Sequence, residues 1–158
     1  MDLYSELFTL IDVLNAERVE YALCVGIAVA IHGFVRFTGD FDFVVRPEDM
    51  DRLVAVLDAQ GFILDFGILP TGAGEEIPCD IRRISKGIGE ELLTLDMILI
   101  NPQTQDVWDS RQTVEWRRRH LTVVSKQGLM KLKLMARRSK DLIDLQELGL
   151  LDEPDAKT

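Results

Sequence analysis

Two aspartates one residue apart, Asp40 and Asp42, stand at the start of an apolar segment with the composition of a β-strand. In an extended chain, residues i and i+2 point to the same side, so the two carboxylates project together. Two like charges held this close repel each other unless a cation neutralises them. Oxygen ligands on a rigid strand suit Mg2+ bound together with a substrate phosphate. The alternative is a solvated strand end with two ordinary acidic residues, since Asp commonly flanks strands.

A third carboxylate, Asp96, is the lone acid within the apolar run 92–100. An unpaired charge inside an apolar strand costs roughly several kcal/mol, so Asp96 needs a cation or a hydrogen-bonding partner. A metal shared with Asp40 and Asp42 is one solution, and a buried arginine or a backbone group is the other. Asp80 is the reserve candidate. Metal ions clamped by three carboxylates stabilise both the attacking and the leaving oxygens of a nucleotidyl transfer.

Four further residues are candidates for phosphate binding. A glycine between a strand and a helix lets a triphosphate approach backbone N–H groups and the helix N-terminus. An arginine offers a bidentate donor, a threonine offers a hydroxyl, and a lysine offers a point charge. Each of these residues also has an ordinary structural reading, as a turn glycine or as a solvated polar side chain. The candidates are Gly26, Arg36, Thr38 and Lys133.

Composition narrows the class of protein. At 158 residues and 47% hydrophobic, the chain is expected to form a single domain over residues 1–158. The net charge of −9 argues against a broad DNA-binding or RNA-binding surface. No apolar run is long enough for a membrane span and the N-terminus is acidic, so a cytoplasmic location is expected. Cys24 and Cys79 lie in apolar runs and are expected to be buried free thiols.

Hydrophobic periodicity predicts an α+β fold, with a small mixed sheet of about five strands covered by helices. Helices are expected at 3–16, at 28–34, from Pro47 to the turn at Gly61, and after the cap residue Ser125. Strands are expected at 21–25, 41–45, 62–66, 79–84, 92–100 and 121–124, with turn chemistry at 67–78 and only short helical pieces within 101–120. A helical segment over 125–150 is expected to close the domain, followed by a flexible tail at 151–158.

The arrangement of these residues resembles the DNA polymerase beta-like nucleotidyltransferase superfamily, in which a small-residue turn leads through a helix to an Asp-x-Asp strand. Within it, the chain is similar to a minimal bacterial branch related to abortive-infection nucleotidyltransferase toxins. The likeness spans most of residues 21–148. The matching positions are Ala28-Val29, His32-Gly33, Arg36, Thr38, Asp40, Asp42 and Asp96, then Lys133, Arg138, Asp141 and Asp144 in the later helical segment.

The resemblance implies a nucleotidyltransferase-like fold, an NTP substrate and Mg2+ as cofactor, with Asp40, Asp42 and Asp96 as catalytic and metal-binding carboxylates. Gly26 would then be the phosphate-turn residue, and Lys133 with Asp141 the later pair. The implied reaction moves an NMP from the NTP to an acceptor hydroxyl on RNA or protein, in a toxin–antitoxin setting with a cognate partner protein. Val25 departs from the signature, which has a small residue there. The alternative is therefore a non-catalytic, nucleotide-binding or antitoxin-like protein with a vestigial site.

Overall fold

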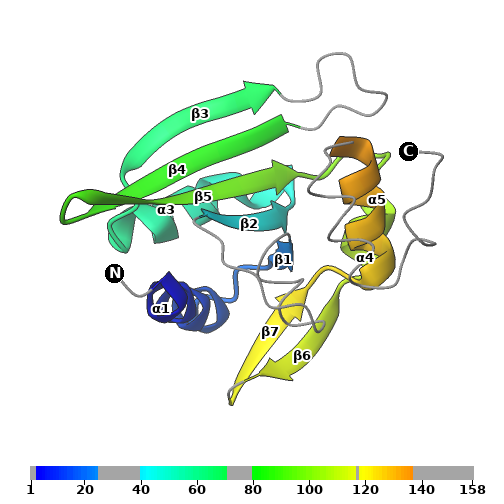
Figure 1. The fold of residues 1–158 in the computed structure, drawn as a ribbon, viewed down its shortest axis with the longest axis horizontal. Helices are drawn as coiled ribbons and strands as arrows, with labels where there is room; N and C mark the ends of the chain where they lie inside the picture. The colour runs from blue at the N-terminus through cyan, green and yellow to red at the C-terminus, as the bar shows by residue number, and fades with distance from the viewer. Residues whose placement is uncertain (1–2, 25–39, 71–79, 117, 137–158) are drawn as a thin grey trace, which may run out of the picture.

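A single mixed sheet organises the chain in the computed structural model, which describes residues 3–24, 40–70, 80–116 and 118–136. The sheet has seven strands in the order β3-β4-β5-β2-β1-β7-β6, so the expectation of about five was too low. β2 pairs with β5 in parallel and β1 pairs with β7 in parallel, whereas the other neighbours are antiparallel (Figure 1). The strands are β1 (Ala22–Cys24), β2 (Asp40–Val45), β3 (Leu64–Pro70), β4 (Asp80–Ile88), β5 (Glu91–Leu99), β6 (Gln112–Trp116) and β7 (Arg119–Val123).

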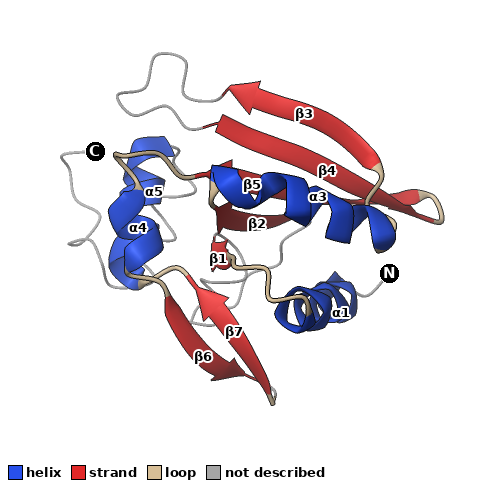
Figure 2. Ribbon diagram, turned by 180° about the vertical axis from the view of Figure 1, so that it is seen from behind, coloured by secondary structure: helices blue, strands red, loops and turns tan. Residues whose placement is uncertain are grey.

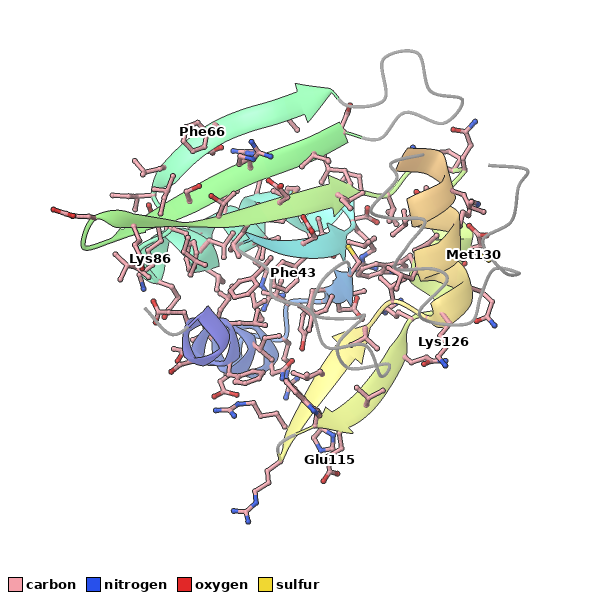
Figure 3. The ribbon with its side chains drawn as sticks, in the orientation of Figure 1. Phe43, Phe66, Lys86, Glu115, Lys126 and Met130 are labelled. Carbon is pink, nitrogen blue, oxygen red and sulfur yellow. The ribbon has the colours of Figure 1, made fainter. Side chains whose placement is uncertain are left out.

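Two helices cover one face of the sheet and form the main core. α1 (Leu3–Ala16) was expected at these bounds, and α3 (Met50–Ala59) follows a 3-10 turn η1 (Pro47–Asp49) that begins with the expected proline. Their apolar residues pack on alternate strand positions such as Phe41, Phe43 and Leu95. Figure 2 shows α3 lying across the sheet with α1 below it, and Figure 3 shows Phe43 pointing into the interior. This burial fixes which side of β2 and β5 faces the helices.

A second, smaller core holds the remaining helices against the ends of β1, β2 and β5. It joins α4 (Gln105–Asp109) to α5 (Lys126–Ala136) through Val107, Trp108 and Leu129, with strand residues such as Val44. The Ser125 hydroxyl accepts a hydrogen bond from the Gly128 amide at 3.0 Å, which confirms the expected helix cap. No helix in the described ranges has the length and apolarity that a membrane crossing requires.

Several strand boundaries differ from the expectations, and one strand was not expected. β3 begins two residues later than expected and runs on through Gly67 to Pro70, where turn chemistry had been predicted. β7 starts at Arg119 rather than residue 121. The segment at 112–116, expected to hold at most short helical pieces, is β6, in which half-buried Val114 and Trp116 pack against the main core and alternate with exposed residues.

The predicted helix at 28–34 and the part of the predicted helical segment 125–150 that follows residue 136 lie outside the described residues, as do Cys79 and the tail at 151–158. Cys24 is buried and is a thiol rather than part of a disulfide, as expected. The predicted pairing of the segments around 79–84 and 92–100 is confirmed, because β4 and β5 form an antiparallel hairpin in continuous register from Asp80 to Glu91. The expected α+β class is confirmed as well.

Candidate active site

The central strands place Asp42 and Asp96 directly beside each other. In the parallel pair formed by β2 and β5, the register opposes Asp42 to Asp96. On either side of this pair the register opposes Arg83 of β4 to Asp96, and Cys24 of β1 to Asp42. Residues opposed in register point to the same face of a sheet. The sequence therefore builds one row of side chains, Arg83, Asp96, Asp42 and Cys24, across four strands.

This row lies on the face turned away from α1 and α3. Phe41 and Phe43 flank Asp42 along β2, and both are buried in the main core beneath those helices. Leu95 and Met97 flank Asp96 along β5 in the same way. Because successive strand residues point to opposite faces, both aspartates must point to the other side. The expectation that Asp42 and Asp96 sit on adjacent strands and share a face is confirmed by this register.

Asp96 is held by an arginine. Arg83 donates from Nε to Oδ1 at 2.7 Å and from Nη2 to Oδ2 at 3.1 Å, a bidentate ion pair. Asp96 is only 8% exposed, whereas the Arg83 side chain is 44% exposed. Charge-assisted bidentate pairs fix both distance and orientation. The arginine partner that the sequence left open as an alternative for Asp96 is therefore present, and it holds the carboxylate in one orientation on the sheet.

The surroundings of the pair are rich in oxygen. Asp42 is half-buried. Asp40 lies two residues before it in β2, opposite Thr94 of β5. The Thr94 hydroxyl lies 2.9 Å from the Ser85 hydroxyl of β4. Within the side chains that the structure describes, which exclude that of Asp40, no three His, Cys, Asp or Glu residues gather closely enough to hold a metal ion. The convergence of the three predicted carboxylates on one metal stays a prediction.

Asp80, the reserve candidate, does not join the pair. It opens β4 opposite Leu99, whose neighbours along β5 place it on the helix-covered face, and it is exposed. Strand alternation thus puts Asp80 on the opposite side from Asp96.

The other predicted site residues are not tested. Lys133 lies on α5, but its side chain is outside the described atoms. Arg119, the first residue of β7, forms an ion pair with Asp12 of α1 at 3.1 Å. Outside the described residues lie Gly26, Arg36, Thr38 and Asp141.

Sequence reasoning missed Arg83. A signal was present, because Arg82 and Arg83 are adjacent charges within a strand and must point to opposite faces. Arg82 forms an ion pair with Asp65 of β3 on the helix-covered side, and Arg83 pairs with Asp96 on the other. Which carboxylate each arginine contacts depends on how β3 and β5 are aligned with β4, and this alignment could not be predicted from the sequence.

Comparison with solved structures identifies the fold. The lincosamide antibiotic adenylyltransferase LnuA, in its lincomycin-bound crystal structure, superposes with a TM-score of 0.58 at 16% identity, over 93% of this chain and 97% of LnuA. ANT(2'')-Ia, in complex with adenylyl-2''-tobramycin, gives a TM-score of 0.58 at 15% identity, over 91% of this chain and 86% of its own. The chain has the nucleotidyltransferase fold.

The same fold occurs in TM1012 from Thermotoga maritima, itself a proposed nucleotidyltransferase, with a TM-score of 0.60 at 12% identity over 89% of this chain and 88% of the other. Neither protein-family profiles nor curated protein sequences gave a match to the chain. At these identities the comparisons establish the nucleotidyltransferase fold and leave the reaction to be argued from the residues. The resemblance to the abortive-infection branch stays a prediction.

Proposed function

We propose that the chain transfers a nucleoside monophosphate from an NTP to a hydroxyl group of an acceptor, at a site built on Asp40, Asp42 and Asp96. The observation that carries this proposal is the register of Asp42 against Asp96 on adjacent parallel strands of a nucleotidyltransferase fold. An acid in each of two neighbouring strands, on one face, brings two like charges together, and Arg83 compensates the charge of Asp96. A cation bound by both carboxylates would balance the charge that remains.

The residues fit a divalent cation in donor type. Asp42 and Asp96 offer only oxygen ligands, and these sit on rigid strands. Such hard donors suit Mg2+. Asp40 is the third proposed ligand, and its place in β2 gives it the same strand parity as Asp42. When bound, the metal supplies positive charge that stabilises the attacking and leaving oxygens of the transfer.

The chain's own groups would orient this site. Arg83 holds the Asp96 carboxylate in a fixed bidentate geometry, so one oxygen ligand is pre-positioned before substrate arrives. Gly26, Arg36 and Thr38 would contact the triphosphate, with Lys133 and Asp141 nearby. No described side chain in the row is a histidine or lysine that would serve as a general base, so one of the aspartates is the proposed proton acceptor for the hydroxyl.

Two classes of acceptor follow from different observations. The resemblance of the sequence to toxin-like proteins favours a hydroxyl on RNA or protein, in a toxin–antitoxin setting with a partner protein. The structural neighbours include enzymes described with lincomycin and with adenylylated tobramycin, which favours a small hydroxyl-bearing molecule. The net charge of −9 weighs against RNA, since polynucleotide binding depends on cationic neutralisation of phosphates.

The first experiment measures thermal unfolding with and without Mg2+ and ATP or GTP. A ligand that binds only the folded chain stabilises it by about 2.7 kcal/mol at a hundredfold excess over Kd, so the melting temperature should rise. Asp42→Asn should abolish the rise while leaving the unliganded protein at least as stable, because one of two neighbouring charges is removed. Asp58→Asn, which removes one exposed charge from α3, is the matched control and should keep the response.

The second experiment separates catalysis from mere binding. The protein is incubated with α-labelled NTP and Mg2+ in the presence of cell RNA, cell protein or a panel of small hydroxyl-bearing compounds. Transfer of label to one class, lost in Asp42→Asn, supports the enzyme and names its acceptor. Mg2+-NTP stabilisation without any transfer supports the alternative, a nucleotide-binding partner protein with a vestigial site. An Asp42→Asn protein that melts lower and still responds to Mg2+-NTP would contradict the site.

A further inference from the structure

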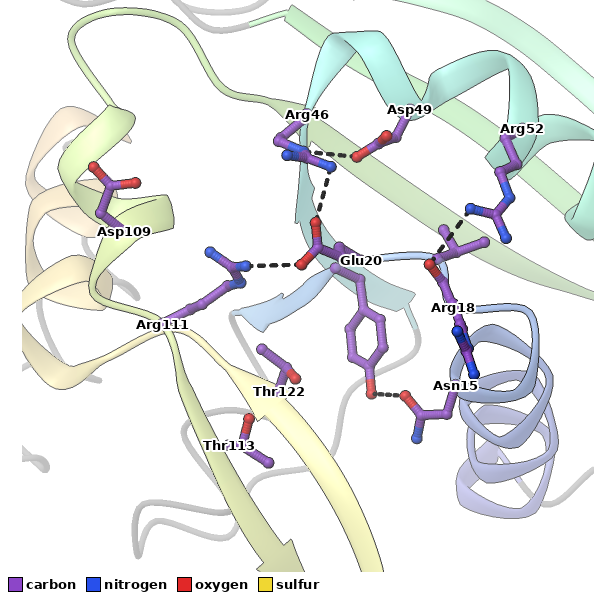
Figure 4. Close-up of a pocket in the computed structure, with 12 residues that line it drawn as sticks. Asn15, Arg18, Glu20, Arg46, Asp49, Arg52, Asp109, Arg111, Thr113 and Thr122 are labelled. Atoms are coloured by element: carbon purple, nitrogen blue, oxygen red, sulfur yellow. Dashed lines mark hydrogen bonds and ion pairs between the residues drawn. The ribbon is translucent and has the colours of Figure 1, made fainter.

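A polar cavity of about 650 Å3 opens where α1, β1, η1 and the segment after α4 meet (Figure 4). None of its lining residues belongs to the row that contains Asp42 and Asp96. Four arginines from separate parts of the chain line it, in a protein whose net charge is −9. A cavity of this volume is the size that small-molecule ligands occupy. The arginines are Arg18, Arg46, Arg52 and Arg111.

Two of these arginines already clamp an oxyanion. The Nη2 of Arg46 lies 2.8 Å from Oε2 of Glu20, and the Nη2 of Arg111 lies 3.2 Å from Oε1 of the same carboxylate. Figure 4 shows Glu20 between the two guanidinium groups. Both groups also stack over the Trp108 ring, at 5.6 Å and 4.0 Å from its centre, which restricts their orientation. The Glu20 side chain is 49% exposed, so a dissolved anion has access to the same donors.

The third arginine occupies a backbone position that favours glycine. Arg18 follows the end of α1 with φ of +57°, and the Val19 amide closes the helix end on the Leu14 carbonyl at 2.9 Å. Helices that end in this left-handed conformation usually use Gly or Asn, because other side chains are strained there. The Arg18 guanidinium makes no hydrogen bond or ion pair to another residue in the described part of the chain, while its carbonyl accepts one from Arg52 at 3.5 Å. A strained arginine with an uncommitted charge at a cavity is more consistent with ligand binding than with folding.

We propose that this cavity binds a small molecule that carries a diphosphate group, at a site separate from the carboxylate pair. One phosphate takes the place of the Glu20 carboxylate between Arg46 and Arg111, and the other meets Arg18. Guanidinium groups match phosphate oxygens in fork geometry. A phosphate has three acceptor oxygens and more negative charge than a carboxylate, so it can displace Glu20 where a second carboxylate would gain little. Hydroxyl donors on the wall, Thr113 and Thr122, suit the remaining oxygens.

The test uses inorganic pyrophosphate as the probe, with EDTA present so that no metal ion bridges it to the aspartates. Isothermal titration calorimetry of the full chain should show saturable binding with one site. Arg18→Gly should weaken binding by about tenfold or more, the effect of losing a charge-assisted hydrogen bond. The same change should raise the melting temperature of the unliganded protein, because glycine adopts a positive φ without strain. A loss of affinity together with a gain of stability is an outcome that a merely structural arginine would not give.

Two control variants make the result specific. Arg118→Gly makes the same substitution at a residue with φ of +66°, exposed in the turn before β7 and away from the cavity, and should keep the pyrophosphate affinity. Asp42→Asn should keep it too, so that the outcome is independent of the proposed transferase site. Glu20→Gln should tighten binding, because it removes the competing carboxylate from the clamp.

Several results would overturn the proposal. These are no binding of millimolar pyrophosphate, equal weakening by Arg18→Gly and Arg118→Gly, or weakening by Asp42→Asn. An unchanged affinity in Glu20→Gln would also overturn it, since the clamp would then take no part. ADP extends the test under the same metal-free conditions: affinity equal to that of pyrophosphate identifies a site that contacts the phosphates alone, and higher affinity identifies a nucleoside diphosphate as the preferred ligand.

Discussion

The Arg83–Asp96 ion pair allows the candidate site to be tested without any substrate. Replacing Arg83 with methionine removes two charge-assisted hydrogen bonds and leaves an aspartate that is 8% exposed beside Asp42. Breaking a fully buried ion pair costs about 3–5 kcal/mol. The Arg83 side chain is 44% exposed, so water can solvate part of the Asp96 charge in the variant and the cost is smaller. We expect a loss of about 2 kcal/mol in the free energy of unfolding, which lowers the melting temperature by about 4–8 °C in a domain of this size.

The second step of this test adds Mg2+ without nucleotide to the Arg83→Met variant. If Asp42 and Asp96 form a cation site, Mg2+ should restore part of the stability lost in Arg83→Met, because the ion replaces the missing positive charge. Urea unfolding at pH 7, with and without millimolar MgCl2, measures this. Arg82→Met is the matched control, since Arg82 is the adjacent residue of β4 and pairs with Asp65 on the opposite face. Mg2+ should not restore that variant.

Two outcomes would refute this reasoning. If Arg83→Met is as stable as the original chain, the ion pair does not hold Asp96. If Mg2+ stabilises Arg82→Met and Arg83→Met equally, the ion acts through general screening rather than at the aspartates. Adding Asp96→Asn to Arg83→Met provides a check on the mechanism, since removal of the orphaned charge should recover stability and abolish the response to Mg2+.

Further predictions concern the fold. The Arg82 guanidinium lowers the pKa of Asp65 below its usual value, so the stabilisation from this pair is present above the unfolded-state pKa and is lost as the pH falls through the folded-state pKa. Asp65→Asn should therefore lower the free energy of unfolding at pH 7 and have no effect at a pH below both values, as measured by urea titration. Gly128→Ala should destabilise α5 by about 1–3 kcal/mol despite alanine's helix propensity, because the added Cβ would come within 2.9 Å of the Val124 side chain. Gly87→Ala, where nothing lies within 4 Å of the added Cβ, is its control in the same denaturation assay and should be near neutral.

The central part of the fold was readable from sequence because its signals are local. The alternation of Phe41 and Phe43 with Asp42 predicts both the strand and its buried face. Pro47 predicts where the next helical turn begins. β6 was missed because its alternation rests on two apolar residues, Val114 and Trp116, in a short edge strand. It exists as a strand through its pairing with β7, a non-local interaction.

The Asp42–Asp96 pair and the arginine-lined cavity differ in the same way, since the sequence predicts the first and not the second. Asp42 and Asp96 could be proposed from sequence, since each is an acid in an otherwise apolar strand, and their juxtaposition follows once β2 and β5 are known to pair. The cavity arginines could not, because Arg18, Arg46 and Arg111 are ordinary surface residues in sequence. They meet only when the helix end, the turn after β2 and the segment after α4 pack around β1.

The position of Arg83 also has a consequence for the proposed chemistry. The guanidinium contacts both oxygens of Asp96, so a metal ion must share or displace a partner that the carboxylate already has. That competition weakens binding of the free ion, whereas an ion that arrives with a triphosphate brings additional contacts of its own. The proposed site should therefore respond weakly to Mg2+ in the original chain and strongly to Mg2+ with NTP. Arg83→Met should reduce the difference between the response to Mg2+ and the response to Mg2+ with NTP, because the Asp96 carboxylate can then bind the free ion. A strong response of the unsubstituted chain to Mg2+ alone would show that Arg83 does not compete for Asp96.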